Sequence, residues 1–186
     1  STAAVDAETV YDLASITKAA ATLPAIMKLY DEKKIRLQDP IGKFVPETRG
    51  SNKANITIRE ALFHESGLVS YIPYYNTAID PNSFNGPLFG KRSSLYHARY
   101  AGAWGRTDYT FIPSFISDKR DETFHRPVAN DLYASNKMHQ ALLKDIIATE
   151  LRSKTYRYSC INFMLLKEAV EQLSKTDLDS YVKENF

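Results

Sequence analysis

Residues 15–34 read SITKAAATLPAIMKLYDEKK. The apolar side chains in this stretch recur every three or four residues, which is the period of one face of an α-helix. The spacing therefore predicts a long buried helix whose apolar face comprises Ile16, Ala19, Ala20, Leu23, Ile26, Met27 and Tyr30. Pro24 lies inside this pattern, so we expect a kink or a local break in the helix at that point.

Helical periodicity also marks later segments, whereas strand-like alternation is scarce. Thr57 and Glu60 predict a capping box for a helix over 58–64, which we expect to end at Ser66-Gly67. Apolar periodicity predicts helices over about 138–151 and 163–173, and a last helix after Asp177. Only residues 8–11 and 35–37 fit short strands. The pattern therefore predicts a mainly α chain.

The stretch 69–134 has a different character, because it holds 13 of the chain's 22 aromatic residues among Pro, Gly and Asn. Two interpretations remain open: an ordered insertion that packs on the helices, or a set of short turns that covers a site. Packing mass is the commoner role of aromatic side chains. We expect a single helical domain over 1–186, interrupted by an aromatic-rich insertion at about 70–155.

Composition excludes several classes of protein. The chain has 186 residues, 44% hydrophobic and 25% charged, which is typical of a soluble globular domain. Its net charge is only +2, with both signs interspersed, so we expect no nucleic-acid partner. No apolar stretch approaches the roughly 18 to 20 residues of a membrane span. The single cysteine, Cys160, excludes an internal disulfide and a cysteine-rich metal site.

A candidate nucleophile lies at the start of the first helix. Ser15 and Lys18 form an S-x-x-K, a spacing that places a hydroxyl and an amine on one helix face, close enough to share a proton. A serine is a poor nucleophile until a base takes its proton, and a lysine can be that base when burial lowers its pKa. A second copy, Ser180 to Lys183, has polar neighbours, whereas Ser15 opens an Ala-rich helix that we expect to be buried. Context therefore favours Ser15 and Lys18.

Further motifs follow in order: residues 9–18 read TVYDLASITK, 33–41 KKIRLQDPI, 44–47 FVPE and 56–68 ITIREALFHESGL. Together they resemble the serine β-lactamase-related family, which includes class C β-lactamases, D,D-peptidases and small-ester hydrolases. The resemblance implies that Ser15 is the nucleophile and Lys18 the base. His64, in the H-x-S-G-L turn, matches a structural position of the family, and we assign it capping or packing but no catalytic role.

The second motif of that family, Y-x-N, has its counterpart in Tyr158-Ser159-Cys160. The resemblance implies that Tyr158 shuttles a proton between Ser15 and the leaving group. Cys160 stands where the family has a carboxamide and would lie beside the substrate. A thiol is a weak donor and acceptor, so this departure argues against turnover of β-lactams.

The third motif of the family, K/H-[ST]-G on a strand, does not occur in these 186 residues. We therefore expect an excised helical domain of the α/β serine β-lactamase/penicillin-binding-protein-like fold, with little or no sheet and no activity by itself. The resemblance implies a serine hydrolase that transfers an acyl group from an ester, amide or peptidoglycan-type substrate. A non-catalytic binding module on the same helices is the alternative.

The resemblance also implies the setting in which such a hydrolase works. The substrate would be a small molecule or a cell-wall peptide, and no metal or organic cofactor is implied. The parent protein would lie in the periplasm or at the cell surface, although the first twenty residues do not read as a secretory signal. A homodimer could cover the face that packs on a sheet elsewhere in the family.

Overall fold

The computed structural model describes residues 4–100 and 102–186. The chain divides into two compact units. Unit 1 comprises Ser1–Tyr71 and Ile147–Phe186, and unit 2 comprises Ile72–Ile146. Unit 2 therefore coincides with most of the stretch in which the sequence changes character.

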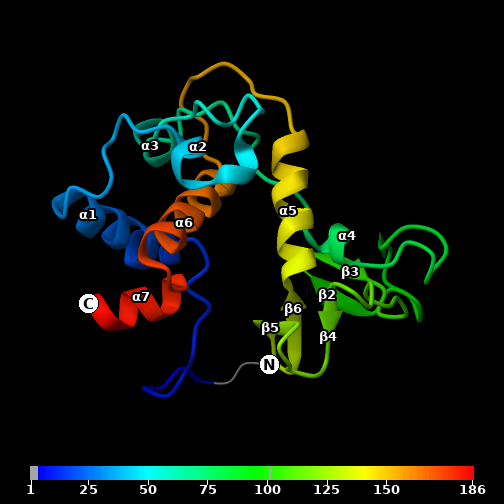
Figure 1. The fold of residues 1–186 in the computed structure, drawn as a ribbon. Helices are drawn as coiled ribbons and strands as arrows, with labels where there is room; N and C mark the ends of the chain where they lie inside the picture. Colours follow the sequence, from blue (N-terminus) through cyan, green and yellow to red (C-terminus); the bar gives the residue numbers. More distant parts are fainter. Residues whose placement is uncertain (1–3, 101) are drawn as a thin grey trace. The chain divides into compact units, whose positions relative to one another are not determined.

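Unit 1 is helical (Figure 1). Its helices are η1, a π-helix (Lys18–Thr22), α1 (Leu23–Asp31), α2 (Ile41–Phe44), the 3₁₀ turn η2 (Pro46–Thr48), α3 (Ile58–Leu62), α6 (Cys160–Ser174) and α7 (Leu178–Asn185). Helix α6 contacts η1, α1, α2, α3 and α7, so it is the central element of the unit. Its apolar side chains are fully buried and include Ile161, Leu165, Leu166, Ala169 and Val170.

The first helix departs from a regular α-helix where Pro24 predicts a local break. Residues 18–22 are π-helical and run directly into α1, since the Leu23 N–H donates to Lys18 O, and Pro24 lies just after this junction with no N–H to contribute to the helical ladder. Ala25, Ile26 and Leu29 are buried, but Ile16, Met27 and Tyr30 are more than half exposed. The predicted apolar face is therefore wrong in most of its residues, since Ala19 and Ala20 are exposed too. The π-turn shifts the helical phase of the residues that precede α1, whereas Met27 and Tyr30 lie within α1 on its exposed face.

The predicted capping box is present, since Thr57 Oγ1 accepts from the Glu60 N–H and Glu60 accepts from the Thr57 N–H. The helix ends at Leu62 and not at the predicted His64, which lies beyond the C-cap Phe63 and has a left-handed φ of 56°. Residues 8–11 and 35–37 are not strands. In the second case the Ile35 N–H donates back to Leu29 O, so the backbone folds into a turn although Ile35 is buried.

Unit 2 contains the sheets, which the sequence does not predict. After α4 (Tyr75–Ala78), the strands β1 (Phe89–Gly90), β2 (Ala98–Tyr100) and β3 (Ala103–Gly105) form an antiparallel sheet in the order β1-β3-β2. The strands β4 (Ile116–Ser117), β5 (Phe124–Ala129) and β6 (Leu132–Ser135) form a second one in the order β4-β6-β5. Helix α5 (Asn136–Ala148) follows. Most of these strands are too short to produce a readable alternation.

The aromatic side chains of this stretch pack in several small groups. Tyr75 contacts Phe89 edge to face, and Tyr109 contacts Phe111 in the same way. A separate cluster of Ala78, Ala134 and Met138 is covered by Phe111, Phe115, Ile116 and Leu142. Apart from the exposed Tyr71, the described aromatic side chains of 69–134 are half-buried. The aromatic side chains of this stretch thus form several small groups and no single aromatic core.

Gly67→Ala is expected to destabilise the chain far more than Gly50→Ala. Both glycines have a φ of +79°, so alanine adds a similar backbone strain of about 1–2 kcal/mol at each. A Cβ at Gly67 would meet the Arg152 carbonyl oxygen at 2.4 Å, whereas nothing lies within 4 Å of a Cβ at Gly50. Urea unfolding measures the difference, and equal losses in the two variants would contradict the expected clash.

Candidate active site

Ser15, Lys18 and Tyr158 meet in unit 1. Lys18 Nζ donates to Ser15 Oγ at 3.0 Å, and the Tyr158 hydroxyl donates to the same oxygen at 2.9 Å. Lys18 Nζ also lies 5.5 Å from the centre of the Tyr158 ring. The structure therefore brings together the three residues that the sequence and the family resemblance predict as catalytic, although 140 residues separate Lys18 from Tyr158.

The turn before the helix presents Ser15. Ala14 has a left-handed backbone, with a φ of 43°, and its N–H donates to Asp12 Oδ1 at 2.8 Å. The Lys18 N–H donates to Ser15 O at 3.1 Å, so Ser15 lies at the start of the first turn. A left-handed alanine costs free energy, and such strain is commonly found next to functional side chains.

The environment of Ser15 favours charge on its oxygen. Two donors, one of them a cationic ammonium, point at Oγ, and charge-assisted hydrogen bonds of this kind stabilise an alkoxide. Ser15 is exposed, Lys18 is half-buried, and Tyr158 is 42% exposed. A substrate can therefore reach the nucleophile and both of its polar neighbours.

The segment that carries Tyr158 is fixed by its neighbours. Ser159 is fully buried; its hydroxyl donates to Val69 O at 2.7 Å, and its Oγ accepts from the Ile161 N–H at the start of α6. The Cys160 N–H donates to Ser70 O at 3.1 Å. Its thiol is half-buried and free, and within the described residues no hydrogen bond joins it to Ser15 or Lys18. A role of Cys160 beside the substrate stays a prediction.

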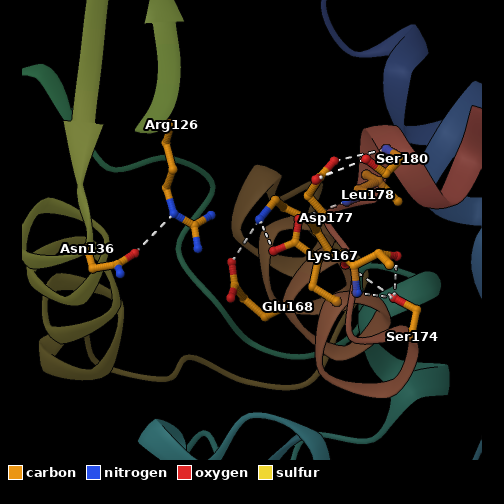
Figure 2. Close-up of polar contacts among 10 residues, drawn as sticks. Arg126, Asn136, Lys167, Glu168, Ser174, Asp177, Leu178 and Ser180 are labelled. Carbon is orange, nitrogen blue, oxygen red and sulfur yellow. Dashed lines mark hydrogen bonds and ion pairs between the residues drawn. The ribbon is translucent and has the colours of Figure 1, made fainter. Parts of the chain in front are cut away.

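The second S-x-x-K is held by ordinary helix contacts in α7. Ser180 donates its N–H to Asp177 Oδ1 at 2.9 Å and its hydroxyl to Asp177 Oδ2 at 3.1 Å, which caps the helix (Figure 2). Lys183 pairs with Asp179 at 2.8 Å on the exposed face. Among the described residues, no hydrogen bond joins the Ser180 hydroxyl to the Lys183 amine, so this copy shares only the spacing of the candidate site.

Two further side chains lie next to the triad: His64, for which the sequence predicts only capping or packing, and Asn162, which the sequence does not single out. The His64 ring lies 4.6 Å from the Tyr158 ring, measured between centroids, and Asn162 is a fully buried polar residue that donates from Nδ2 to His64 Nδ1 at 3.2 Å. A polar residue inside the apolar pattern of the last long helix was the available signal for Asn162. In residues 4–100 and 102–186, no group of three or more His, Cys, Asp or Glu side chains has the arrangement of a metal site.

Comparisons with known proteins agree with this geometry. The family model described as Beta-lactamase matches residues 1–186. A solved structure, that of the octameric penicillin-binding protein homologue from Pyrococcus abyssi, matches with a TM-score of 0.52 and 21% sequence identity. The match covers 92% of this chain and 29% of that one, so this chain spans less than a third of that protein's length. No curated protein sequence matches. At this identity the structural likeness concerns the fold alone.

Proposed function

The chain belongs to the Beta-lactamase family, a family of serine hydrolases, and from this premise we propose that its site performs acyl transfer through Ser15. The family match confirms the predicted resemblance. The predicted fold class, a helix-rich portion of the serine β-lactamase/penicillin-binding-protein-like fold, is confirmed as well, and the two small sheets supply the strands of this portion. The observation that carries the proposal is the position of Ser15 Oγ, within hydrogen-bond distance of both Lys18 Nζ and the Tyr158 hydroxyl.

In the proposed reaction, Ser15 Oγ attacks the carbonyl carbon of an ester, an amide or a peptidoglycan-type peptide. The proton of Ser15 passes to Lys18, the proposed base, and Tyr158 hands its proton to the departing oxygen or nitrogen and regains one from Lys18. The bond from the carbonyl carbon to the leaving group breaks, and an ester on Ser15 remains. Water then attacks this ester in the same way and releases the acid, so every proton is returned.

Acylation is tested most directly by mapping the adduct. The chain is mixed with p-nitrophenyl acetate, quenched and digested, and mass spectrometry locates the acetyl group. We expect the acetyl group on Ser15. Mass spectrometry detects a single acylation event, so the experiment does not require the chain to turn over substrate. Ser180 serves as a control within the same molecule, since it shares the motif but bonds to the helix cap Asp177. Equal labelling of Ser15 and Ser180 would contradict the proposal.

A longer form of the protein is expected to hydrolyse the ester faster than the 186 residues alone. In the family, the oxyanion hole combines the nucleophile's N–H with an N–H from a sheet strand, and losing one such donor costs a factor of about 10² to 10³ in turnover. The third motif, which lies on that sheet, is not among these residues. The comparison uses steady-state rates of both forms, each with a Ser15→Ala partner; equal rates would show that these residues suffice.

We propose a periplasmic or cell-surface location for the protein and a small-molecule or cell-wall peptide as substrate, because the family resemblance implies both. Fractionation of the source cells measures the location. No helix in the described part of the chain is long and apolar enough to cross a membrane.

A homodimer is a further part of the proposal. Several apolar side chains of unit 1 are exposed between residues 10 and 30: Val10, Ile16, Met27 and Tyr30. Such exposed apolar surface favours association with a second copy. Light scattering of the purified chain measures its mass in solution, and a monomer across the accessible concentrations excludes the dimer.

A second candidate function, a binding module, is favoured by a pocket in unit 2. The pocket has a volume of about 180 Å³, and its wall includes the rings of Tyr75, Phe89 and Tyr109 and the apolar Ile79 and Leu88. An apolar cavity of ~150 Å³ is large enough for one benzene ring. The size and lining of this pocket therefore fit a single aromatic ring.

Benzyl alcohol is expected to bind in this pocket with about millimolar affinity, as is typical of a ligand of this size. Gly105 lines the pocket, and a Cβ there would already lie 3.4 Å from the Phe89 ring, so Gly105→Val should block the site. Trp104, the chain's single tryptophan, precedes Gly105 in β3 and reports binding by its fluorescence. The pocket is excluded as a binding site if the fluorescence change does not saturate with benzyl alcohol concentration. It is also excluded if Gly105→Val gives the same fluorescence change as wild type.

A further inference from the structure

His64 holds the chain on both sides of Tyr158. Its main-chain oxygen accepts from the Arg157 N–H at 2.8 Å, and its ring nitrogen Nδ1 accepts from the Ser159 N–H at 3.2 Å. The rings of His64 and Tyr158 lie 4.6 Å apart between centroids, with planes inclined by 44°. One residue therefore contacts the Tyr158 ring and both of the amides that flank it.

The backbone of His64 makes this double contact possible. Its φ of 56° lies in the left-handed region, where a residue other than glycine or asparagine is uncommon. In this conformation the main-chain oxygen and Nδ1 both face the segment 157–159. Neighbouring hydrogen bonds stabilise this strained conformation. One of them joins the Glu65 N–H to Glu60 O at 2.8 Å.

The hydrogen bonds also fix the protonation state of the ring. A main-chain N–H can only donate, so the Ser159 N–H requires an unprotonated Nδ1. Asn162 Nδ2 is a second donor to the same atom, at 3.2 Å. A protonated ring would turn an N–H toward these donors. Asn162 could rotate its amide to accept from it, but the Ser159 amide could not. The contact therefore requires neutral His64.

We propose that neutral His64 is a positioning residue that keeps the Tyr158 hydroxyl within reach of Ser15, and that protonation of its ring releases the segment 157–159 and turns the site off in acid. The proposal rests on the proposed function of Tyr158 as the proton shuttle. It gives His64 no contact with the substrate, because His64 acts through the Tyr158 ring and its flanking amides.

The groups around His64 favour the neutral ring at neutral pH. Burial lowers the pKa of His64 below its ordinary value of 6.5, and the positive charge of Lys18 on η1 lowers the pKa further. The other neighbours are rings: Tyr156 and Tyr158 on the preceding segment and Phe163 on α6. Because the pKa of His64 is lower in the folded chain than in the unfolded chain, neutral His64 stabilises the folded state fully above pH 6.5. This stabilisation is lost as the pH falls through the folded-state pKa of His64.

Two variants separate positioning from a general loss of structure. His64→Asn keeps an acceptor at the position of Nδ1, tolerates the left-handed backbone and cannot titrate; His64→Ala has neither the acceptor nor the ring. Acylation of Ser15 by p-nitrophenyl acetate is measured between about pH 5 and 8. The base of the proposed reaction also gains a proton in acid, so we expect the wild-type rate to fall more steeply in acid than that of His64→Asn, which retains most of the neutral rate. We expect His64→Ala to fall by about 10²-fold at every pH.

A second readout does not depend on catalysis. Nuclear magnetic resonance follows the Tyr158 ring signals, assigned with Tyr158→Phe, while His64 titrates. Changes in the Tyr158 chemical shifts that follow the His64 titration in wild type and are absent in His64→Asn support the positioning role. If these changes are seen but no variant forms an acyl adduct, the proposed function is overturned and the positioning role of His64 stands. A Tyr158 ring that ignores the titration, or an acid loss that is as steep in His64→Asn as in wild type, overturns the inference about His64.

Discussion

Replacing Ser15 with alanine is expected to abolish acylation of the chain and to lower hydrolysis of p-nitrophenyl acetate by on the order of 10⁴-fold in a form that turns over. The substitution removes the oxygen on which both Lys18 Nζ and the Tyr158 hydroxyl converge. No other hydroxyl in the described residues accepts from both groups. The loss should appear in kcat and in kcat/KM alike, because the covalent step itself is removed.

Ser180→Ala is the matched control for this experiment. Ser180 occupies the same motif position, but its hydroxyl donates to Asp177 at a helix start, so its removal affects only the stability of α7. Asp177 is the helix cap and keeps its bond from the Ser180 N–H, so the variant loses one exposed side-chain hydrogen bond, which is worth about 0.5–1.5 kcal/mol. Thermal unfolding should show this small loss for Ser180→Ala with hydrolysis unchanged. Residual Ser15-independent hydrolysis near the wild-type rate would exclude Ser15 as nucleophile.

Tyr158→Phe is expected to reduce the rate of Ser15 acylation by about 10²- to 10⁴-fold, the usual contribution of a positioned proton donor or acceptor. The variant loses the hydroxyl that lies 2.9 Å from Ser15 Oγ and keeps the ring that packs on His64. Because the side chain is 42% exposed, the fold should tolerate the change. Pre-steady-state release of p-nitrophenol measures the acylation step directly.

Tyr156→Phe tests whether the effect is specific to the hydroxyl at Ser15. Tyr156 also contacts the His64 ring, at 6.4 Å between centroids, but it is 72% exposed, and among the described residues no hydrogen bond joins its hydroxyl to Ser15. We expect acylation in this variant to stay within a few-fold of wild type. Equal losses in the two tyrosine variants would assign the effect to ring packing and withdraw the shuttle role from Tyr158.

The helices of unit 1 were predictable because their signals are local. The capping box of Thr57 and Glu60 and the cap at Asp177 are short-range sequence features, and both are present in the structure. The exposure of Met27 and Tyr30 was not predictable, because periodicity shows which side chains share a face and not which element covers that face. In unit 2, strands of two to six residues leave too short a pattern to recognise.

The residues of the candidate site differ in how far they could be predicted from the sequence. Ser15 and Lys18 lie one turn apart, so spacing alone brings them together, whereas Tyr158 could be linked to them only through the family resemblance. The sequence predicted only a capping or packing role for His64 and did not single out Asn162, because their contacts depend on a left-handed backbone at His64 and on the packing of α6 against α3. No sequence pattern encodes either of these features directly.

The π-helical turn of η1 allows this helix to lose one residue without a change in the direction of Ser15. A π-turn is an α-helix that holds one residue more than its regular ladder requires. Deleting a single residue from Lys18–Thr22 would therefore yield a regular helix, and each residue of an α-helix turns the chain by about 100°. The five residues of the π-turn rotate the chain about as far as four residues of a regular α-helix, so Ser15 would keep its direction relative to α1. A one-residue deletion is thus absorbed in this turn, whereas the same deletion within a regular α-helical turn would rotate everything before it by about 100°.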